Sequence, residues 1–310
     1  MHEVDAKSLL TNWGSMNLYR GCAHGCVYCD SRSRCYQFTH PFEDIEVKRN
    51  APELLEGILR AKRKRIMIGT GSMSDPYQPC EGQLRLTRRC LELIDRYGFG
   101  AAVITKSDLV LRDIDLFDSI HRGAKSVLQM SLTVADDDLS RILEPHVCPS
   151  SRRYEVLKEF QRRNIPTVVW LTPFLPFLTD TEENFDRLME WCLDAGVRGI
   201  ICFNIGMTLR DGDREYYYDA LDRHFPGLRE RYRRTYGNAY EVVSANSSRL
   251  MGRFHSLCET RGILHDPAEC FAYLRELPEK HTQISLFDGS AERDSGDALQ
   301  TPSSRNTGYR

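Results

Sequence analysis

The sequence predicts an α/β protein built on a partial (β/α)6 barrel of the TIM type, followed by a C-terminal helical extension. From about residue 15 to residue 204, short apolar runs alternate with amphipathic segments. This alternation is typical of right-handed βαβ units that build a parallel sheet. Six such units in about 190 residues are too few for a complete eight-stranded barrel, which takes about 250 residues.

The expected strands are short apolar runs bounded by glycine, proline or polar residues. They lie at residues 15–19, 65–69, 100–105, 126–133, 166–171 and 197–204. The expected helices lie between them, at residues 52–64, 84–97, 112–121, 150–163 and 181–195. In the first helix Leu55, Ile58 and Leu59 share one side. Gly98 follows the second helix and Gly196 the last, positions at which glycine is a stop signal.

Three regions are expected along the chain. Residues 1–210 form the barrel core, and residues 211–280 form a mainly helical extension. Residues 281–310 are rich in Ser, Gly, Asp and Thr and poor in apolar residues, a composition typical of a disordered tail.

Composition and charge exclude several classes of protein. The 310 residues carry a formal net charge of −2, so the strong basicity typical of nucleic-acid-binding proteins is absent. The N-terminal residues contain no secretory signal, and no apolar run is long enough to predict a membrane span. Eleven cysteines without an export signal predict a reducing, cytoplasmic location, where thiols bind metals or pack in the core.

Cys22, Cys26 and Cys29 follow the first expected strand with C-x3-C-x2-C spacing. Such a loop can wrap three thiolates around one iron–sulfur cube. Because the cube has four irons, three protein ligands leave one iron open. An open iron on a reducing cluster can bind and cleave a small molecule.

A zinc site is the alternative interpretation of these cysteines. Cys26 and Cys29 supply half of such a site, which Cys35, His24 or His40 could complete. Structural zinc sites usually contain a second matching pair, and none follows at suitable spacing. The spacing therefore favours the iron–sulfur interpretation.

The cysteine motif resembles the signature of radical S-adenosylmethionine (SAM) enzymes. The resemblance implies a [4Fe-4S] cluster whose open iron binds SAM, and an electron donor such as flavodoxin or ferredoxin. One electron then breaks a carbon–sulfur bond of SAM and yields a 5′-deoxyadenosyl radical that abstracts a hydrogen atom from the substrate. The cofactors supply the reactive chemistry, and the protein supplies ligands, orientation and a water-poor cavity.

The segment after the second expected strand narrows the resemblance. It reads Gly69-Thr70-Gly71-Ser72-Met73-Ser74-Asp75-Pro76-Tyr77-Gln78-Pro79. Taken alone it is an ordinary glycine- and proline-rich turn, although glycine also lets a backbone approach a ligand closely. Its Asp-Pro-Tyr-Gln-Pro run resembles the spore photoproduct lyase-like branch of the superfamily. The resemblance implies that the methionine end of SAM binds here, with these candidate residues: Gly69, Thr70, Gly71, Ser74 and Asp75.

Further SAM contacts are implied at other positions. The resemblance places Lys106 near the SAM carboxylate, which an ammonium group suits, and Tyr28 near the adenine. Ser131 lies in an expected parallel strand, where polar residues are unusual, and is a candidate for the SAM ribose or amino acid part. Asn204 ends the sixth strand and is a candidate contact or an ordinary cap. The segment 143–146, Leu-Glu-Pro-His, matches another recurring segment of the branch without an assigned role.

One position departs from the branch. Spore photoproduct lyase has a cysteine just before the serine that matches Ser74, and that cysteine returns a hydrogen atom to the product radical. Here the residue is Met73, whose thioether has no S–H to give, so repair of the spore photoproduct itself is in doubt. Cys80 is a candidate substitute donor, with core or surface placement as the alternative. Cys35 is a candidate redox or auxiliary thiol, but we favour a structural role for it.

Gln283-Ile284-Ser285-Leu286-Phe287 resembles the short peptide with which bacterial repair and replication proteins dock on the sliding clamp. In this interpretation Ile284, Leu286 and Phe287 insert into a pocket of the clamp, and Gln283 supplies polar contacts. A last short strand or a self-docking tail is the alternative, because apolar pentapeptides occur often by chance. A clamp peptide supports a DNA substrate independently of the family.

Three functions follow from these patterns. The first is a lyase-like radical SAM enzyme that acts on damaged or modified DNA, as in DNA repair, where the base must usually be unstacked. The second applies the radical to RNA, a protein or a small metabolite, which the near-neutral charge favours slightly. The third is a non-catalytic zinc or iron–sulfur module, which the polar residues at the strand ends argue against.

Overall fold

The computed structural model describes residues 1–278 and confirms an α/β fold around a parallel sheet of six strands. The strands lie side by side in chain order: β2 (Ser15–Met16), β5 (Met67–Thr70), β6 (Gly100–Thr105), β7 (Ser126–Ser131), β8 (Thr167–Trp170) and β9 (Gly199–Ile201). Every pairing in this sheet is parallel, so the carboxyl ends of the strands meet at one edge. This sheet is the expected incomplete barrel, with β2 and β9 at its two ends.

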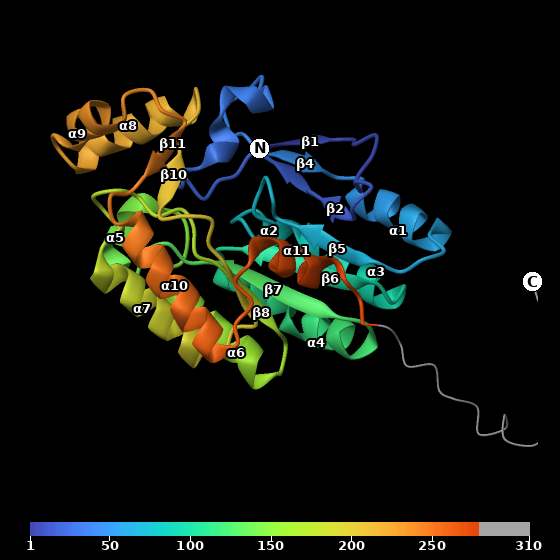
Figure 1. Ribbon diagram of the computed structural model, residues 1–310. Coiled ribbons are helices and arrows are strands. Elements are labelled where there is room, and N and C mark those ends of the chain that lie inside the picture. Colours follow the sequence, from blue (N-terminus) through green and yellow to red (C-terminus); the bar gives the residue numbers. More distant parts are fainter. Residues whose placement is uncertain (279–310) are drawn as a thin grey trace, which may run out of the picture. The chain divides into compact units, whose positions relative to one another are not determined.

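Helices that connect the strands cover the outer face of the sheet (Figure 1). They are α1 (Ala51–Ala61), α3 (Leu86–Arg96), α4 (Ile114–Gly123), α6 (Ser150–Arg162) and α7 (Glu182–Asp194), with the short α2 (Glu81–Leu84) and α5 (Asp137–Leu143) after β5 and β7. Their apolar sides are buried, as Leu55 and Leu59 of α1 illustrate. A 3-10 helix, η3 (Asp108–Asp113), precedes α4, so this α-helix begins two residues later than its apolar pattern predicts.

Residues 211–278 are mainly helical, as expected. They form α8 (Asp213–His224), α9 (Leu228–Tyr236), α10 (Ser247–Arg261) and α11 (Pro267–Arg275). They also contain a strand that the sequence pattern did not indicate, β11 (Glu241–Val243), which pairs antiparallel with β10 (Gly206–Thr208). One strand of this pair precedes residue 210 and the other follows it, although the barrel core was expected to end at that residue.

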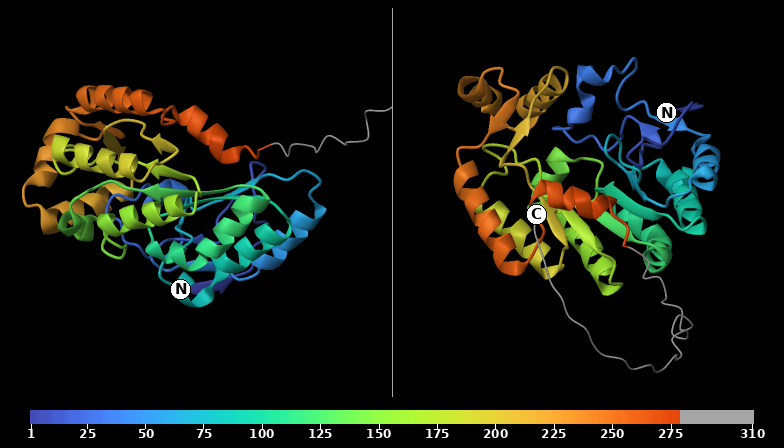
Figure 2. Two further views of the ribbon diagram at one scale, coloured as in Figure 1. Left: turned by 90° about the horizontal axis from the view of Figure 1, so that it is seen from below. Right: turned by 45° about the vertical axis from the view of Figure 1, so that its right-hand side comes forward.

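Helix α11 packs on the face of the sheet opposite α3 and α4 (Figure 2). Its Cys270 and Leu274 are buried against one inward-facing side chain from each of five strands: Met67, Ala102, Val127, Val168 and Ile201. The helix therefore closes the inside of the incomplete barrel away from the carboxyl edge.

The N-terminal strand expected at residues 15–19 is divided between two sheets. Residues 15–16 form β2, whereas β3 (Tyr19–Arg20) turns away and pairs antiparallel with β4 (Glu46–Lys48). The strand β1 (His2–Val4) pairs parallel with the other side of β4. The cysteine loop leaves this small sheet after β3, carries the 3-10 helices η1 (Asp30–Arg32) and η2 (Arg34–Tyr36), and returns to the sheet at β4.

Two expectations fall outside the described residues. They are the tail at 281–310 and the clamp peptide at 283–287. Among the residues that the structure does describe, no helix has the length and apolar character needed to cross a membrane.

Candidate active site

A cavity of about 770 Å³ opens at the carboxyl edge of the parallel sheet. Its lining includes every residue that the sequence assigned to the cluster or to SAM: Cys22, Cys26, Tyr28, Cys29, Gly69, Thr70, Gly71, Ser74, Asp75, Lys106, Ser131 and Asn204. These residues come from the cysteine loop and from the ends of β5, β6, β7 and β9. The fold thus brings together in one place groups that lie far apart in the sequence.

The cysteine loop is held in place by the segment that follows β5. The Ser74 hydroxyl donates to the Gly21 carbonyl at 2.6 Å, and the Ala23 amide donates to the Gln78 side chain at 3.0 Å. Gly21 has a φ of +85°, and a Cβ there would lie 2.4 Å from the Phe42 carbonyl oxygen, so this position needs glycine. Ser74 and Gln78 therefore position the loop that carries the three thiols.

Asp75 joins the ends of two neighbouring strands. Its carboxylate accepts hydrogen bonds from the Thr105 hydroxyl at 2.7 Å and from the Lys106 amide at 2.8 Å. A Cβ on Gly71 would lie 2.2 Å from the Ile104 carbonyl oxygen, so glycine is what allows β5 to end this close to β6. Asp75 thus fixes the end of β6, from which the Lys106 side chain enters the cavity.

A buried ion pair forms the floor beneath the cysteine loop. Arg153 and Glu144 are both fully buried and contact each other directly. The Tyr28 hydroxyl donates to the same carboxylate, and Arg153 donates to the Ser131 carbonyl at 2.9 Å. Burying two charges is costly unless their remaining groups are hydrogen-bonded, and here the surrounding hydrogen bonds meet that need.

The segment 143–146 also holds the cysteine loop through its backbone. The Val27 amide donates to the Leu143 carbonyl at 2.9 Å, and the His146 amide donates to the His24 carbonyl at 3.1 Å. Sequence reasoning could not assign a role to this segment. The structure shows it as the support on which the loop rests.

The charges of Glu144, Arg153 and Lys106 shift one another's pKa values. Burial favours the neutral form of Lys106, but the negative charges of Glu144 and, once it is deprotonated, of Cys26 more than offset this effect and raise the pKa of Lys106. Burial also opposes the charge on Glu144, yet Arg153 and Lys106 hold the pKa of its carboxyl below the usual range. The cavity therefore has a fixed positive charge on Lys106, 5.8 Å from the Tyr28 ring centroid.

Two of the three thiols, those of Cys22 and Cys26, hold their protons when no metal is bound. Burial, together with the nearby Asp75 carboxylate, raises the pKa of Cys22 to about 12, and burial raises the pKa of Cys26 well above its ordinary value. A metal must displace these protons when it binds.

The arrangement of the thiols fits an iron–sulfur cube better than one zinc ion. Two thiolates on one zinc lie at most about 4.6 Å apart, because each Zn–S bond is about 2.3 Å. Within residues 1–278, no set of three His, Cys, Asp or Glu ligand atoms within 4.8 Å of one another includes Cys22, Cys26 or Cys29. The Thr70 hydroxyl is also buried without a hydrogen-bond partner and lines the same cavity, where a polar ligand would satisfy it.

Two other cysteines that were considered in the sequence do not line the cavity. Cys80 is half-buried at the start of α2, packs against the core, and has its pKa raised to about 11 by burial. Cys35 is exposed, with its sulfur 3.8 Å from the Arg210 guanidinium. The structure therefore does not bring Cys80 to the position that a hydrogen-atom donor needs.

An aromatic rim, which sequence reasoning missed, forms the outer part of the cavity. It comprises Trp13, Trp170, Phe203 and Phe271, with Arg275 beside them. Trp13 is 79% exposed and Phe203 is 53% exposed, while the rings of Trp170 and Phe203 are 6.2 Å apart. The Arg275 guanidinium lies 5.6 Å from the Phe271 ring centroid. Bulky aromatic residues at the ends of two strands were the signal that could have revealed this surface.

Comparison with known proteins agrees with this geometry. Residues 16–192 match the radical SAM superfamily. An uncharacterized protein of Mycobacterium bovis is 30% identical over 250 residues, which are 76% of this chain and 73% of that protein. An uncharacterized protein of Methanocaldococcus jannaschii is 33% identical over 171 residues, which are 54% of this chain and 62% of that protein.

Solved structures of spore photoproduct lyase are similar in fold. One variant superimposes with a TM-score of 0.60 at 16% identity and covers 85% of this chain and 80% of the lyase. Another, with bound AdoMet and dinucleoside spore photoproduct, has a TM-score of 0.56 at 15% identity and covers 80% of this chain and 74% of the lyase. At such identity the likeness shows the fold alone.

Proposed function

This chain belongs to the radical SAM superfamily, and we propose that its substrate is a damaged or modified base in DNA. The protein is a radical SAM enzyme that uses a [4Fe-4S] cluster and SAM. When bound, these cofactors supply a 5′-deoxyadenosyl radical. The proposal concerns the substrate, a lyase-like reaction and a role in DNA repair.

The aromatic rim is the observation that carries the substrate class. Exposed Trp13 and Phe203, with Trp170 at the end of β8, offer flat apolar faces at the mouth of the cavity. Stacking of a base on such a ring is worth about 1–3 kcal/mol and tolerates any base. A base inside a duplex must be unstacked to reach a buried reactive centre, and these rings compensate for the lost stacking. The fold shared with spore photoproduct lyase adds support.

The chain's own residues have distinct parts in this function. In this proposal Cys22, Cys26 and Cys29 would hold the cluster, and the charged Lys106, which lines the same cavity, would pair with the SAM carboxylate. The Tyr28 ring lines the same cavity, and Thr70, Ser131 and Asn204 offer polar groups there. Helix α11 closes the barrel interior against water.

The test begins with anaerobic protein whose cluster has been reconstituted. With dithionite and SAM, 5′-deoxyadenosine is measured alone and in the presence of undamaged DNA, ultraviolet-damaged single-stranded DNA and RNA. We expect damaged DNA to raise 5′-deoxyadenosine formation and to be converted to a new product. Equal formation in all arms would contradict the DNA substrate while leaving the radical chemistry intact, and stimulation by RNA alone would move the substrate to RNA.

We also propose an electron donor, a protein partner and a cellular location for this enzyme. A flavodoxin or ferredoxin supplies the electron, and the reducing cytoplasm suits a protein with eleven cysteines. The peptide at 283–287 docks on the sliding clamp through Gln283, Ile284, Leu286 and Phe287. Replacing Leu286 and Phe287 with alanine abolishes clamp binding in a pull-down and leaves iron content unchanged; unaltered binding removes this partner.

A further inference from the structure

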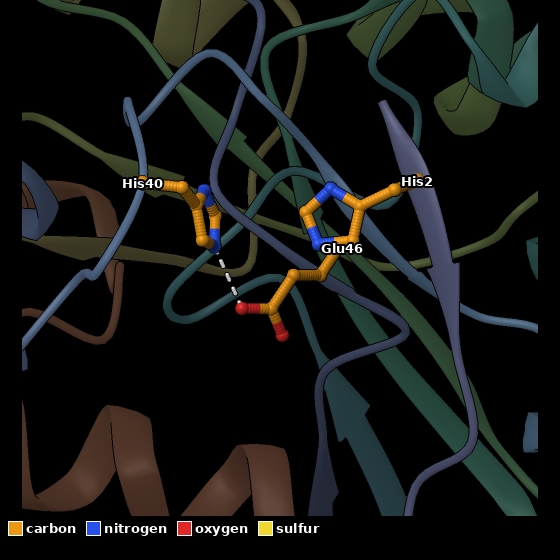
Figure 3. A group of neighbouring side chains, drawn as sticks. All are labelled: His2, His40 and Glu46. Atoms are coloured by element: carbon orange, nitrogen blue, oxygen red, sulfur yellow. Dashed lines mark hydrogen bonds and ion pairs between the residues drawn. The ribbon is translucent and has the colours of Figure 1, made fainter.

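Two histidines and one glutamate meet on the small sheet beside the cysteine loop (Figure 3). His2 of β1 and Glu46 of β4 are register partners in a parallel strand pair, so the backbone fixes them side by side. His40 reaches them from the end of the cysteine loop. One ligand atom from each residue lies within 4.8 Å of the other two. The two imidazole rings are 5.1 Å apart and nearly perpendicular, at 87°.

The outer nitrogen of each histidine already has an oxygen partner. His40 Nδ1 is 3.0 Å from the Pro41 carbonyl oxygen, and His2 Nδ1 is 3.1 Å from the Asp44 carboxylate. In the tautomer whose Nδ1 protons are donated to these oxygens, each Nε2 atom carries a lone pair that can bind a metal. Metal-bound histidines typically donate their second nitrogen to a carbonyl or a carboxylate in this way.

One of these Nε2 atoms, that of His40, faces the glutamate. His40 Nε2 lies 2.7 Å from Glu46 Oε1, a distance that requires a positive charge between a neutral imidazole nitrogen and a carboxylate. Arg20 lies 3.5 Å from the same oxygen and orients the carboxylate from its other side. A proton on His40 or a metal ion can supply the charge, and the metal also satisfies His2.

We propose that His2, His40 and Glu46 bind one zinc ion, separate from the cluster of the cysteine loop. Two imidazoles and one carboxylate are typical zinc ligands, with water in the fourth position, whereas magnesium and calcium prefer oxygen ligands alone. The side chains of His40 and Glu46 are 16% and 17% exposed and that of His2 is 41% exposed, so the ion can enter from solvent. His40, which sequence reasoning considered for a zinc site with the cysteines, belongs to this group instead.

The ion clamps the cysteine loop. Arg20, two residues before Cys22, pairs with Glu46 in β3 and β4, and His40 lies at the other end of the loop. A metal on His40 and Glu46 therefore ties the returning end of the loop to the strand beside its starting end, and His2 adds the N-terminal strand. Because the ion joins these segments only when the chain is folded, its binding stabilises the folded state. The site does not depend on the DNA substrate.

The test uses the full chain with its cluster reconstituted anaerobically, so that the three cysteines are occupied by iron. Zinc is added, the excess is removed by gel filtration, and zinc and iron are measured by elemental analysis. We expect one zinc per chain in the parent and none in His40→Asn or Glu46→Gln, with iron content unchanged. A variant in which Cys22, Cys26 and Cys29 are all alanine keeps its zinc.

The matched control is another histidine pair. The rings of His255 and His265 are 5.3 Å apart, but within the described residues no carboxylate completes a ligand group with them. His255→Asn therefore retains its zinc. Zinc that persists in both His40→Asn and Glu46→Gln, or a parent that binds none, overturns the site.

A thermal measurement tests the clamp. A ligand that binds only the folded state raises the melting temperature, so zinc raises it in the parent and the chelator EDTA reverses the rise, whereas His40→Asn responds to neither. Zinc bound by these residues without a shift in melting temperature overturns the clamping role.

Discussion

The floor beneath the cysteine loop and the aromatic rim of the cavity are built from opposite kinds of contact. On the floor, Glu144 and Arg153 are fully buried, and Tyr28 adds a hydrogen bond to the same carboxylate. On the rim, Trp13 and Phe203 expose most of their surface. A buried, fully paired network admits one arrangement, whereas exposed rings accommodate planar partners in several. In the proposed function, the floor positions the cofactors and the rim contacts the substrate.

The largest expected effect comes from removing the thiols above the floor. Replacing Cys22, Cys26 and Cys29 with alanine abolishes iron binding, because no other cysteine lines the cavity in the described residues. Iron content and the brown absorption of the reconstituted protein measure it. Cys80→Ala is the control and retains the full iron content. If the triple variant also retained it, the assignment of the cluster would fail.

The floor itself gives the next largest effect. Glu144→Ala leaves the buried Arg153 unpaired, and breaking a buried ion pair in this way costs about 3–5 kcal/mol. Denaturant unfolding of the metal-free protein measures the loss. Glu159→Ala, which removes an exposed partner of Arg162, is the matched control, with a cost below about 1 kcal/mol. Equal losses in the two variants would contradict the role of the floor.

The rim gives a smaller and more selective effect. Phe203→Ala removes one stacking surface worth about 1–3 kcal/mol, so affinity for single-stranded DNA falls about 5- to 150-fold. Iron content and SAM binding stay at the parent level, because Phe203 lies outside the floor. Fluorescence anisotropy of a labelled oligonucleotide measures the affinity. Tyr240→Ala, at an exposed aromatic residue that does not line the cavity, is the control; an equal loss there would show that the rim is not specific.

Sequence patterns predicted the longer strands and helices and the three cysteines, but not the small N-terminal sheet. The strand at residues 100–105 and the helix at 150–162 were predicted almost to the residue, because each is long enough to show a clear apolar pattern. The three cysteines were found because their spacing is local. Pairing of β1, β3 and β4 was not predicted, since strands of two or three residues carry no periodic signal.

The contacts that complete the site are tertiary. Glu144 and Arg153 come from the end of α5 and the interior of α6, and nothing in the sequence showed that their side chains meet under Tyr28. The rim draws on Trp13, Trp170, Phe203 and Phe271, which only the curvature of the sheet and the placement of α11 bring together. For these residues chain position and residue type are insufficient, because the contact depends on the packing of the whole barrel.

The smallest expected effect comes from the difference between two buried carboxylates, those of Glu144 and Asp213. Glu144 has cations on two sides. Asp213 accepts a hydrogen bond from the Arg210 amide at 2.6 Å, and its other oxygen is buried without a hydrogen-bond partner among residues 1–278. Burial, with a contribution from Asp30, raises the pKa of Asp213 to about 7. The unfolded chain releases this proton near pH 4 and the folded chain near pH 7, so this carboxyl stabilises the fold below pH 4 and loses that contribution as the pH rises to 7.

Asp213→Asn removes this dependence while keeping an acceptor for the Arg210 amide. Between pH 6 and pH 8 the parent should therefore lose about 1 kcal/mol of unfolding free energy relative to the variant. Urea unfolding at the two pH values measures the difference, and Asp219→Asn, at a carboxylate that is 68% exposed, is the control and follows the parent. If the unfolding free energy of the variant changed with pH as that of the parent does, Asp213 would be paired or hydrated in solution. Its carboxylate would then be stabilised much as that of Glu144 is.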